Sequence, residues 1–430
     1  MSKIKEYQKS CYKLILSKNN TVEFGQKSNS NVFVVGDVGS YKTRGYVIPN
    51  VMNDDYSMVI IDAKGEIEAK TRQIKEMQGY KVISLNFENP ALSQNHYNPL
   101  HYINGKEKEY QNDILYFADM MFPSDCFNGH IDPFWPNNSK NMIAAITAYM
   151  TEKLPEEEQT LEKLSELINQ HNKADMKGIS ELDKVFEQDN EDDESNNLSF
   201  AQRTWNAFNA VSASPKMRAT IISEINSRFL RLLTDDVIKL TNSDDCEIDR
   251  IGDRKTIVYI HTSDTDRSKD FLVSMFIHNC LEQLKRKADK SENMSLSIHT
   301  HFIFDDIGCN VKIDNLDGYM SCLRSREISI SLVLQSEHQM KKMYGDSYHT
   351  IISNCAYYLF MSSGDLEACE IIARKMDKPL EDVMYKNNDT VFILPRCQKP
   401  FEDYKYLLQS HPMYKYLDGE YYKQNEIEIA

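Results

Sequence analysis

The feature that most constrains the fold of this protein is a short apolar run that ends in a glycine-containing turn. The run covers residues 32–35 and is followed by Gly36, Gly39, Lys42 and Thr43. This spacing is typical of a phosphate-binding loop, which joins a buried strand to the N-terminus of a helix. In such a loop, backbone N–H groups and the lysine surround phosphate oxygens, and the threonine hydroxyl binds magnesium. The pattern therefore predicts a nucleotide site.

One position of the loop departs from the usual pattern. The residue before the lysine is normally glycine, because the backbone passes close to phosphate there, and in this sequence it is Tyr41. A side chain at a position with positive φ costs roughly 1–2 kcal/mol, and the ring can also obstruct phosphate. An ordinary glycine turn between a strand and a helix is therefore the alternative interpretation, and the rest of the sequence decides between them.

The composition limits the class of protein. A length of 430 residues is enough for two domains, or three. The 50 Lys and Arg residues against 65 Asp and Glu residues give a net charge of -15, which excludes a global basic surface for nucleic acid. Any contact with DNA must then be local, or must lie in a channel built by several subunits.

Cysteine usage and hydropathy indicate the compartment. The nine cysteines are odd in number, are scattered and form no Cys-x-x-Cys pair, which is typical of reduced thiols. No apolar run approaches the roughly 20 residues that span a bilayer. We therefore expect a soluble, cytoplasmic protein.

The order of apolar runs predicts an α/β fold with a mostly parallel sheet. Before residue 100 we expect a helix over 42–52 that kinks or ends early at Pro49, strands over 58–62 and 80–85, and a helix over 66–78. From residue 256 we expect strands over 256–261, 297–306, 328–334, 357–361 and 391–394, with helices over 268–287, 346–353 and 364–376.

Between these two parts the strand signal disappears. Helical periodicity is found at 113–121, 139–150, 161–171 and 219–233. We therefore predict a nucleotide-binding domain formed by residues 1–110 and 251–430, and an all-α insertion domain over residues 111–250. Residues 181–194 hold eight acidic residues and one basic residue, a composition that favours a solvated loop over a packed element.

Polar residues follow several predicted strands at their carboxyl ends, where open α/β sheets bind ligands. Asp305 and Asp306 end one strand. In a nucleotide triphosphatase the first of two such carboxylates holds magnesium through water, and the second polarises the attacking water. Asp62 and Glu66 follow another strand and are candidates for the same site. Gln335 follows a third strand, at a place suited to sensing a γ-phosphate.

Two histidines lie close together in one predicted strand. His299 and His301 are two residues apart, so their side chains share a face of the strand. Two histidines without a third ligand nearby are more often packed or surface residues than a metal site. We therefore assign them no metal.

Taken together, these blocks resemble the TraG-like coupling proteins of type IV secretion and conjugation. The resemblance extends from about residue 14 to about residue 412. It is carried by the segment Asn31 to Arg44 with Pro49 and Asn50 after it, Asp62 to Glu66, Asn98 and Pro99, Phe134 and Trp135, Phe304 to Asp306, Leu323 to Ile328, Leu334 to Ser336, Tyr344 and Gly345, and Asn354 and Cys355.

The resemblance implies a RecA-like nucleotide-binding domain interrupted by an all-α domain that takes part in recognising relaxase and DNA. It implies a homo-hexameric ATPase that uses ATP and magnesium, is recruited to the inner face of the cell membrane by a membrane-bound anchor subunit, and brings DNA and relaxase to the transfer channel. It also implies that Arg324 or Arg326 reaches the nucleotide of a neighbouring subunit.

The predicted site residues fall into three sets. The residues predicted to bind ATP are Gly36, Gly39, Ser40, Tyr41, Lys42, Thr43, Arg44, Asp62 and Glu66. Magnesium is assigned to Thr43 and Asp305. The residues predicted to act in hydrolysis are Asp305, Asp306, Arg324, Arg326 and Gln335.

Three departures from the family pattern leave the function open. Tyr41 replaces a glycine, Asp306 replaces the usual glutamate and is one methylene too short for an ideal base, and the N-terminal transmembrane helices common in the family are absent. The first hypothesis is a working ATPase that moves DNA or a protein–DNA substrate. The second is a degenerate member that serves as a docking platform for relaxase and DNA. A DNA translocase unconnected with secretion is a third, weaker alternative.

Overall fold

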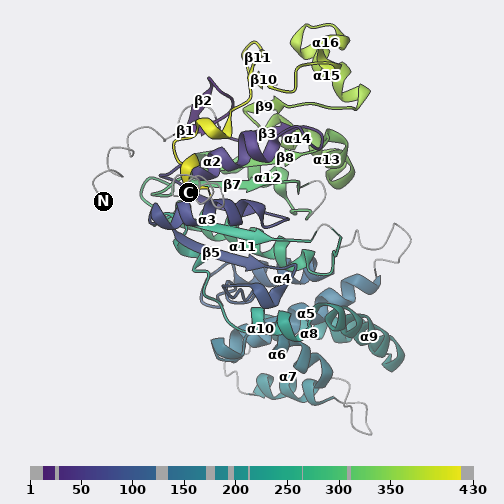
Figure 1. Ribbon diagram of the computed structural model, residues 1–430. Coiled ribbons are helices and arrows are strands. Elements are labelled where there is room, and N and C mark those ends of the chain that lie inside the picture. The colour runs from purple at the N-terminus through teal and green to yellow at the C-terminus, as the bar shows by residue number, and fades with distance from the viewer. Residues whose placement is uncertain are drawn as a thin grey trace. The chain divides into compact units, whose positions relative to one another are not determined.

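The structure, a computed structural model, describes residues 13–24, 29–122, 134–170, 180–191, 198–211, 214–263, 265–307 and 311–417. The protein divides into two compact units, which are described separately (Figure 1). The first unit consists of residues 1–88 and 247–430, and the second of residues 89–246.

The first unit is built on a nine-stranded sheet with the order β11-β10-β9-β3-β8-β7-β4-β6-β5. A separate antiparallel hairpin, β1 and β2, precedes it. The strands are β1 Lys13–Ile15, β2 Thr21–Glu23, β3 Val32–Val35, β4 Ser57–Ile61, β5 Lys81–Asn86, β6 Thr256–His261, β7 Thr300–Phe304, β8 Ile328–Leu334, β9 Tyr357–Phe360, β10 Thr390–Pro395 and β11 Phe401–Tyr404.

Within this sheet, the strands from β9 to β5 pair in parallel. Strand β10 pairs antiparallel with both of its neighbours, β9 and β11. Strands β3, β4, β7 and β8 are buried along their whole length. Strands buried along their whole length are expected where helices cover both faces of a parallel sheet. The predicted mostly parallel α/β sheet is confirmed. The edge strand β11 alternates between half-buried and exposed residues, and the sequence prediction did not include it.

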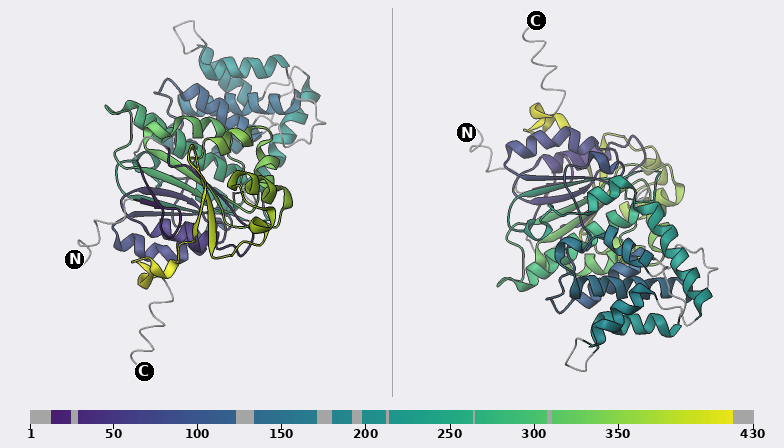
Figure 2. Two further views of the ribbon diagram at one scale, coloured as in Figure 1. Left: turned by 90° about the horizontal axis from the view of Figure 1, so that it is seen from above. Right: turned by 90° about the horizontal axis from the view of Figure 1, so that it is seen from below.

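Helices cover both faces of the sheet, as Figure 2 shows with the purple helices on one side and the green helices on the other. The helical elements of this unit are the π-helix η2 Thr43–Val47, α2 Ile48–Met52, α3 Glu66–Met77, η6 Ile248–Arg250, α11 Asp270–Lys290, α12 Leu316–Cys322, η8 Arg324–Arg326, α13 Glu337–Tyr344, α14 Ser347–Ser353, α15 Leu366–Met376, α16 Leu380–Met384, η9 Leu408–Ser410 and η10 Tyr414–Tyr416.

The helix predicted over 42–52 changes type along its length. It is a π-helix from Thr43 to Val47 and an α-helix from Ile48 to Met52. Pro49 lies in the first turn of the α-helical part, where its missing N–H leaves no gap in the ladder. The helix does not end early at Pro49, because it continues to Met52.

The second unit is helical throughout its described residues. Its elements are η3 Pro90–Leu92, α4 Tyr110–Met121, α5 Phe134–Lys153, η5 Glu156–Glu158, α6 Leu161–Gln170, α7 Glu181–Glu191, α8 Phe200–Val211, α9 Pro215–Leu232 and α10 Asp235–Thr241. Among all the described residues of the protein, no helix is both long and apolar enough to cross a membrane.

The helical unit begins earlier than the predicted boundary at residue 110. The segment before α4 is bound to the end of the unit, because the Tyr97 N–H donates to the Leu240 carbonyl at 2.9 Å and the Tyr102 hydroxyl donates to Asp244 at 2.7 Å. These contacts place residues 89–109 with the helices and not with the sheet.

The acidic segment predicted as a solvated loop is a helix over its described part, and this prediction was wrong. Ser180 and Asp183 form a reciprocal pair of hydrogen bonds that starts α7, which is a capping box. Leu182 and Phe186 are buried, and the Phe186 ring stacks on Trp205 with a centroid distance of 4.3 Å. Leu182 and Phe186 are four residues apart, so one face of the helix is apolar and can be buried. Their burial stabilises the helix despite the acidic residues around them. Residues 192–194 lie outside the described part.

We expect Phe186→Ala to destabilise the helical unit. Removing a buried aromatic ring typically costs about 3–5 kcal/mol through lost burial and the cavity left behind. Urea unfolding, followed by tryptophan fluorescence, measures the effect. The control is Glu187→Ala, an exposed position on the same helix. If the two variants unfold at the same urea concentration, α7 does not pack as described.

Candidate nucleotide site

The sheet register brings the predicted site residues other than the two arginines to one edge. Val35 of β3 pairs with Leu334 of β8, and Phe304 of β7 pairs with Leu332 of β8 and with Ile61 of β4. The strands are parallel, so all of them end at the same edge. The phosphate loop, the carboxylate pair, Gln335 and Asp62 therefore follow neighbouring strands.

The loop after β3 has the backbone of a phosphate-binding turn. A Cβ at Gly36 would lie 2.4 Å from the Ser40 Oγ and 2.7 Å from the Met361 Cβ, so only glycine fits. Gly39 has a φ of 81°, and Tyr41 has a φ of 65°. The sequence argument about Tyr41 is thus correct in its physical basis, because the tyrosine occupies a left-handed backbone conformation.

Two predicted residues of the loop are in place at the start of the helix. The buried Lys42 Nζ donates to the Gly36 carbonyl at 2.5 Å and to the Asp37 carbonyl at 3.2 Å. The Thr43 hydroxyl donates to Asp305 Oδ2 at 2.9 Å. The hydrogen bond between Thr43 and Asp305 joins the two motifs that the sequence assigned to phosphate and magnesium.

Asp305 is a buried carboxylate with spare acceptor capacity. Burial and, to a smaller extent, the neighbouring charge of Asp306 raise the pKa of Asp305 to about 7. Its Oδ1 atom has no hydrogen-bond partner among the described residues. Ionising this buried carboxylate is costly unless a cation lies nearby. A carboxylate beside a threonine hydroxyl is also the kind of ligand pair that magnesium takes at a phosphate loop.

Asp306 has a φ of 50° and is half-buried. Aspartate tolerates the left-handed region better than most residues because its short side chain can bond locally. Aspartate therefore fits the left-handed backbone conformation of residue 306 better than the usual glutamate would. Its Oδ1 atom also has no partner among the described residues.

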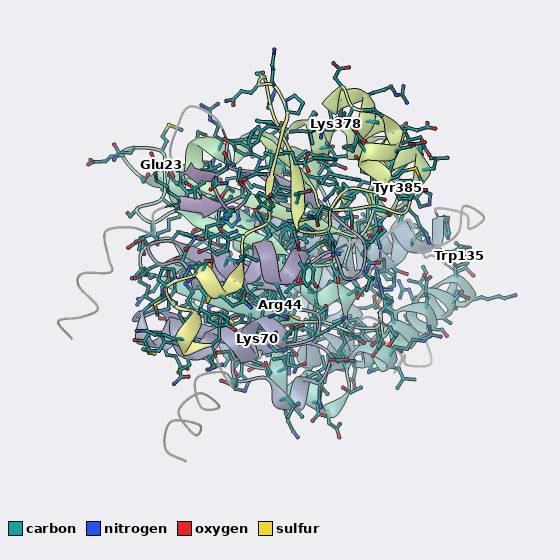
Figure 3. All side chains as sticks on the ribbon, turned by 45° about the horizontal axis from the view of Figure 1, so that its top comes forward. Glu23, Arg44, Lys70, Trp135, Lys378 and Tyr385 are labelled. Atoms are coloured by element: carbon teal, nitrogen blue, oxygen red, sulfur yellow. The ribbon has the colours of Figure 1, made fainter. Side chains whose placement is uncertain are left out.

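The remaining predicted ATP ligands differ in their surroundings. Asp62 is buried and accepts a hydrogen bond from the Glu68 N–H at 2.8 Å, so it caps the start of α3. Glu66 pairs with Lys70 on the surface. Arg44 is exposed on η2 (Figure 3). Capping α3 is sufficient to explain why Asp62 is buried, and no ligand is needed for it. The binding roles of Asp62, Glu66 and Arg44 stay predictions.

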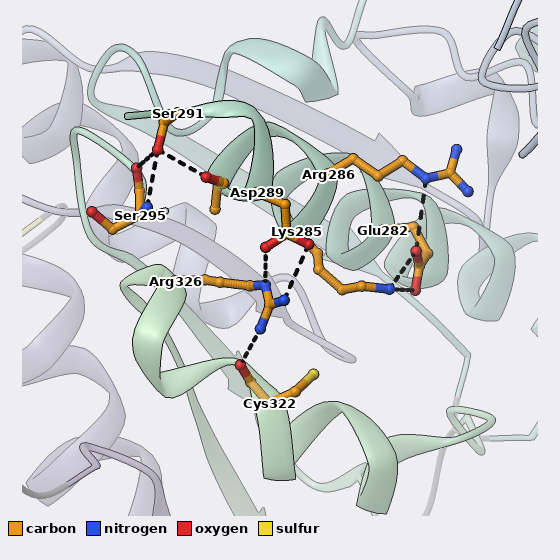
Figure 4. A network of polar contacts seen from close by, with 9 residues as sticks. Glu282, Lys285, Arg286, Asp289, Ser291, Ser295, Cys322 and Arg326 are labelled. Atoms are coloured by element: carbon orange, nitrogen blue, oxygen red, sulfur yellow. Dashed lines mark hydrogen bonds and ion pairs between the residues drawn. The ribbon is translucent and has the colours of Figure 1, made fainter. Parts of the chain in front are cut away.

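The predicted arginines lie at the opposite edge of the sheet, before β8 begins. Arg326 donates to both carboxylate oxygens of Asp289, at 2.7 and 3.1 Å, and to the Cys322 carbonyl (Figure 4). Arg324 is exposed, lines a cavity of about 490 Å³, and forms no side-chain hydrogen bond or ion pair within the described part of the protein. The structure therefore distinguishes two residues that the sequence left equivalent.

Sequence reasoning missed Lys405, which follows β11. Its buried Nζ donates to the Ser40 carbonyl at 2.8 Å and to Asn388 at 3.0 Å, and it lies 5.9 Å from the centre of the Tyr41 ring. Burial lowers the pKa of Lys405 to about 8, and the Lys42 charge acts in the same direction. Only the pairing of β11 brings this lysine to the loop, so no local sequence signal points to it.

The family model described as type IV secretory system conjugative DNA transfer matches residues 2–378. The protein belongs to this family. The family was predicted from the sequence motifs, and the match confirms it. No protein in a curated collection matches the sequence.

Solved structures with this fold include a bacterial conjugative coupling protein and VirB4. Unbound TrwBdeltaN70, a bacterial conjugative coupling protein, has a TM-score of 0.64 at 13% identity, over 94% of this protein and 91% of that one. The complex of TrwBdeltaN70 with sulphate has a TM-score of 0.63 at 12% identity, and the match covers 88% of this protein and 85% of that one. VirB4 of Thermoanaerobacter pseudethanolicus has a TM-score of 0.54 at 12% identity, and the match covers 93% of this protein and 97% of VirB4.

TrwB has also been solved with a non-hydrolysable ATP analogue and with ADP and Mg²⁺. At such low identities, the likeness to these structures establishes the fold. The predicted RecA-like α/β fold is thereby confirmed.

We expect Asp305→Asn to stabilise the protein at neutral pH. The pKa of Asp305 is about 7 in the folded protein and about 3.9 when unfolded. Ionisation therefore opposes folding: the penalty is absent below pH ~4, grows as the pH rises, and is complete above pH ~7. The variant should melt at a higher temperature than the parent at pH 8 and at the same temperature at pH 4. Glu370→Gln, an exposed carboxylate of α15, should change neither value. Equal melting temperatures at pH 8 would contradict this account of Asp305.

We expect Lys405→Met to loosen the phosphate loop. Methionine keeps an unbranched side chain but removes the charged donor to the Ser40 carbonyl, a bond worth about 1.5–3 kcal/mol. Amide hydrogen exchange of residues 37–41 should become faster while exchange in β3 is unchanged. Lys405→Arg, which retains the charge and the donors, should exchange like the parent. Unchanged loop exchange in Lys405→Met would show that the lysine does not hold the loop.

Proposed function

We propose that this protein is an ATP-binding coupling protein that delivers DNA and relaxase to a conjugative transfer channel. The observation that carries the proposal is the hydrogen bond between Thr43 and Asp305 at 2.9 Å. It unites, across the sheet edge, a phosphate loop and a strand-end carboxylate, which is the pairing that nucleotide triphosphatases use. Membership of the DNA-transfer family supplies the setting.

The residues present fit nucleotide and magnesium. Two buried polar atoms, Ser40 Oγ and Asp305 Oδ1, have no partner among the described residues. Lys42 and the loop N–H groups would hold the phosphates, and Thr43 and Asp305 would hold the metal. Bound magnesium neutralises charge that develops on phosphate oxygens. The chemistry left to Asp306 is to polarise a water molecule as general base.

The position of Arg324 favours an assembly of several copies. The seven residues of β8 separate the edge with Arg324 from the edge with the phosphate loop. At about 3.3 Å per residue this is roughly 23 Å, so Arg324 does not reach the nucleotide of its own subunit. Arg326 is bound to Asp289. We therefore assign the contact with a neighbouring nucleotide to Arg324, and we propose a homo-hexameric ring as the assembly in which it forms.

The cargo and the membrane contact are further parts of the proposal. The net charge of -15 gives no global attraction to DNA, so DNA would contact a channel formed by the ring. The helical unit, residues 89–246, would take part in recognising relaxase. A membrane-bound anchor subunit would recruit the protein to the inner face of the cell membrane from the cytoplasm.

A second candidate function is favoured by two observations. Tyr41 has a positive φ and a ring that is 50% exposed beside the loop, and Asp306 carries one methylene fewer than glutamate. Both features lower the catalytic power expected of the site. A protein that binds nucleotide but does not hydrolyse it would serve as a docking platform for relaxase and DNA.

ATP hydrolysis, measured as phosphate release with magnesium over a range of protein concentrations and with or without single-stranded DNA, tests the proposal. We expect Lys42→Ala to abolish ATP binding. We expect Arg324→Ala to lower turnover on the order of 10³-fold, the value typical of an arginine supplied to a neighbouring site, and only at concentrations where rings form. Arg326→Ala should instead lower stability, because it leaves Asp289 unpaired.

Each outcome distinguishes the two functions. Turnover that rises with protein concentration supports the ATPase. Tight ATP binding without turnover, at every concentration and with DNA present, supports the docking platform. A parent protein that binds ATP no better than Lys42→Ala would contradict both, since each depends on an intact phosphate loop.

A further inference from the structure

A series of polar side chains crosses one face of the central sheet among apolar neighbours. It links, in order, Glu327, His299, Ser329, His301, Ser331 and Tyr46. The successive distances between their bonded atoms are 2.9, 2.7, 2.7, 2.9 and 2.7 Å. We name this series the Glu327–Tyr46 relay.

The sheet register explains why these residues meet. His301 of β7 pairs directly with Ser329 of β8 in parallel register. Residues two positions apart in a strand share a face, so His299 and Ser331 lie on the same face as this pair. The relay therefore passes back and forth between two neighbouring strands.

Hydrophobic packing covers the relay. The Phe24 ring stacks on His299 with a centroid distance of 3.9 Å and lies 5.6 Å from His301. His301 and Tyr46 are fully buried. Burial lowers the pKa of both histidines, so both rings are neutral near neutral pH. Each neutral ring has one donor and one acceptor nitrogen.

The charge at one end sets the direction of every bond. The hydrogen bond with His299 lowers the pKa of Glu327, so this carboxylate is ionised and only accepts. His299 must then donate from Nδ1, and its Nε2 must accept from the Ser329 hydroxyl. Repeating this step along the series makes the Tyr46 hydroxyl a donor at the far end.

The two ends lie at the two places that the proposed function requires. Glu327 and His299 line the same cavity of about 490 Å³ as Arg324. Tyr46 belongs to η2, the helix that begins at Thr43 in the phosphate loop. The relay therefore connects the amino edge of the sheet with the helix at the nucleotide edge.

We propose that the Glu327–Tyr46 relay positions the nucleotide helix according to what occupies the Arg324 cavity. A phosphate oxygen held by Arg324 would share this cavity with the Glu327 carboxylate, and the like charge alters how strongly Glu327 accepts from His299. Each hydrogen bond polarises the next, so the change extends to Tyr46. Glu327, His301 and Ser331 act here as positioning residues. The inference rests on the proposed nucleotide site and on the assignment of Arg324.

Side-chain NMR tests the relay without nucleotide. In protein labelled with ¹⁵N at histidine and ¹³Cζ at tyrosine, we expect both relay histidines to carry the proton on Nδ1. Glu327→Gln should shift the Tyr46 ¹³Cζ resonance, and the same change should have no effect on it in a Ser331→Ala background. A proton on Nε2 of His301, or a Glu327→Gln effect that persists without Ser331, would overturn the relay.

A double-mutant cycle tests its effect on ATP binding. Glu327→Gln and Tyr46→Phe should each change the affinity, and the double variant should differ from the product of the single effects by at least about twofold, equivalent to ~0.5 kcal/mol. Glu292→Gln, an exposed carboxylate outside the relay, should change nothing. Additive effects would overturn the coupling.

The two experiments separate the two proposals. If the parent protein binds no ATP, the proposed function fails, and the NMR measurement still decides whether the relay exists. If the parent binds ATP and the cycle is additive, only the coupling fails. Folding of each variant is checked by the unchanged resonances of tyrosines outside the relay.

Discussion

The candidate nucleotide site depends on the hydrogen bond between Thr43 and Asp305, because it joins residues that are 262 positions apart in the sequence. It forms only if β3 and β7 both lie next to β8 and end at the same edge. The buried apolar strands that produce this order supply the stability, since parallel sheets are held by burial on both faces. The polar atoms then lie at the carboxyl edge of the strands, where open α/β sheets bind ligands.

Two departures from the usual motifs act mainly through the backbone. Asp306 suits its own positive φ better than glutamate would, whereas Tyr41 has a positive φ at a position where glycine is usual, so its side chain is a cost to the stability of the folded protein. Lys405 offsets part of it by holding the Ser40 carbonyl and by lying over the Tyr41 ring. The loop therefore accommodates Tyr41 at positive φ with Lys42 and Lys405 both bonded to its carbonyl groups.

Sequence patterns predict the secondary structure correctly where the signal lies within a single strand or helix. The strands β6 and β8 have the bounds that their apolar runs predict. Thr43 and Asp305 are distant in the sequence, and only the resemblance of each to a known motif predicts that they meet. The patterns failed where partners are distant: Lys405 meets the loop only through β11, and Ser329 and Ser331 gain their partners only from the register of β7. Composition also misled, because the buried Phe186 outweighs the acidic residues around it.

In the proposed function, the two edges of the sheet carry complementary halves of a site. The phosphate loop and carboxylates lie at the carboxyl edge, whereas Arg324 lies at the amino edge, separated by the length of β8. On this proposal, one subunit would hold both halves without bringing them together, and a head-to-tail ring is the arrangement that would close such heterologous contacts. In that arrangement every subunit both offers an arginine and receives one. A buried polar connection between the edges would give each subunit a way to relate its own nucleotide helix to its neighbour's state.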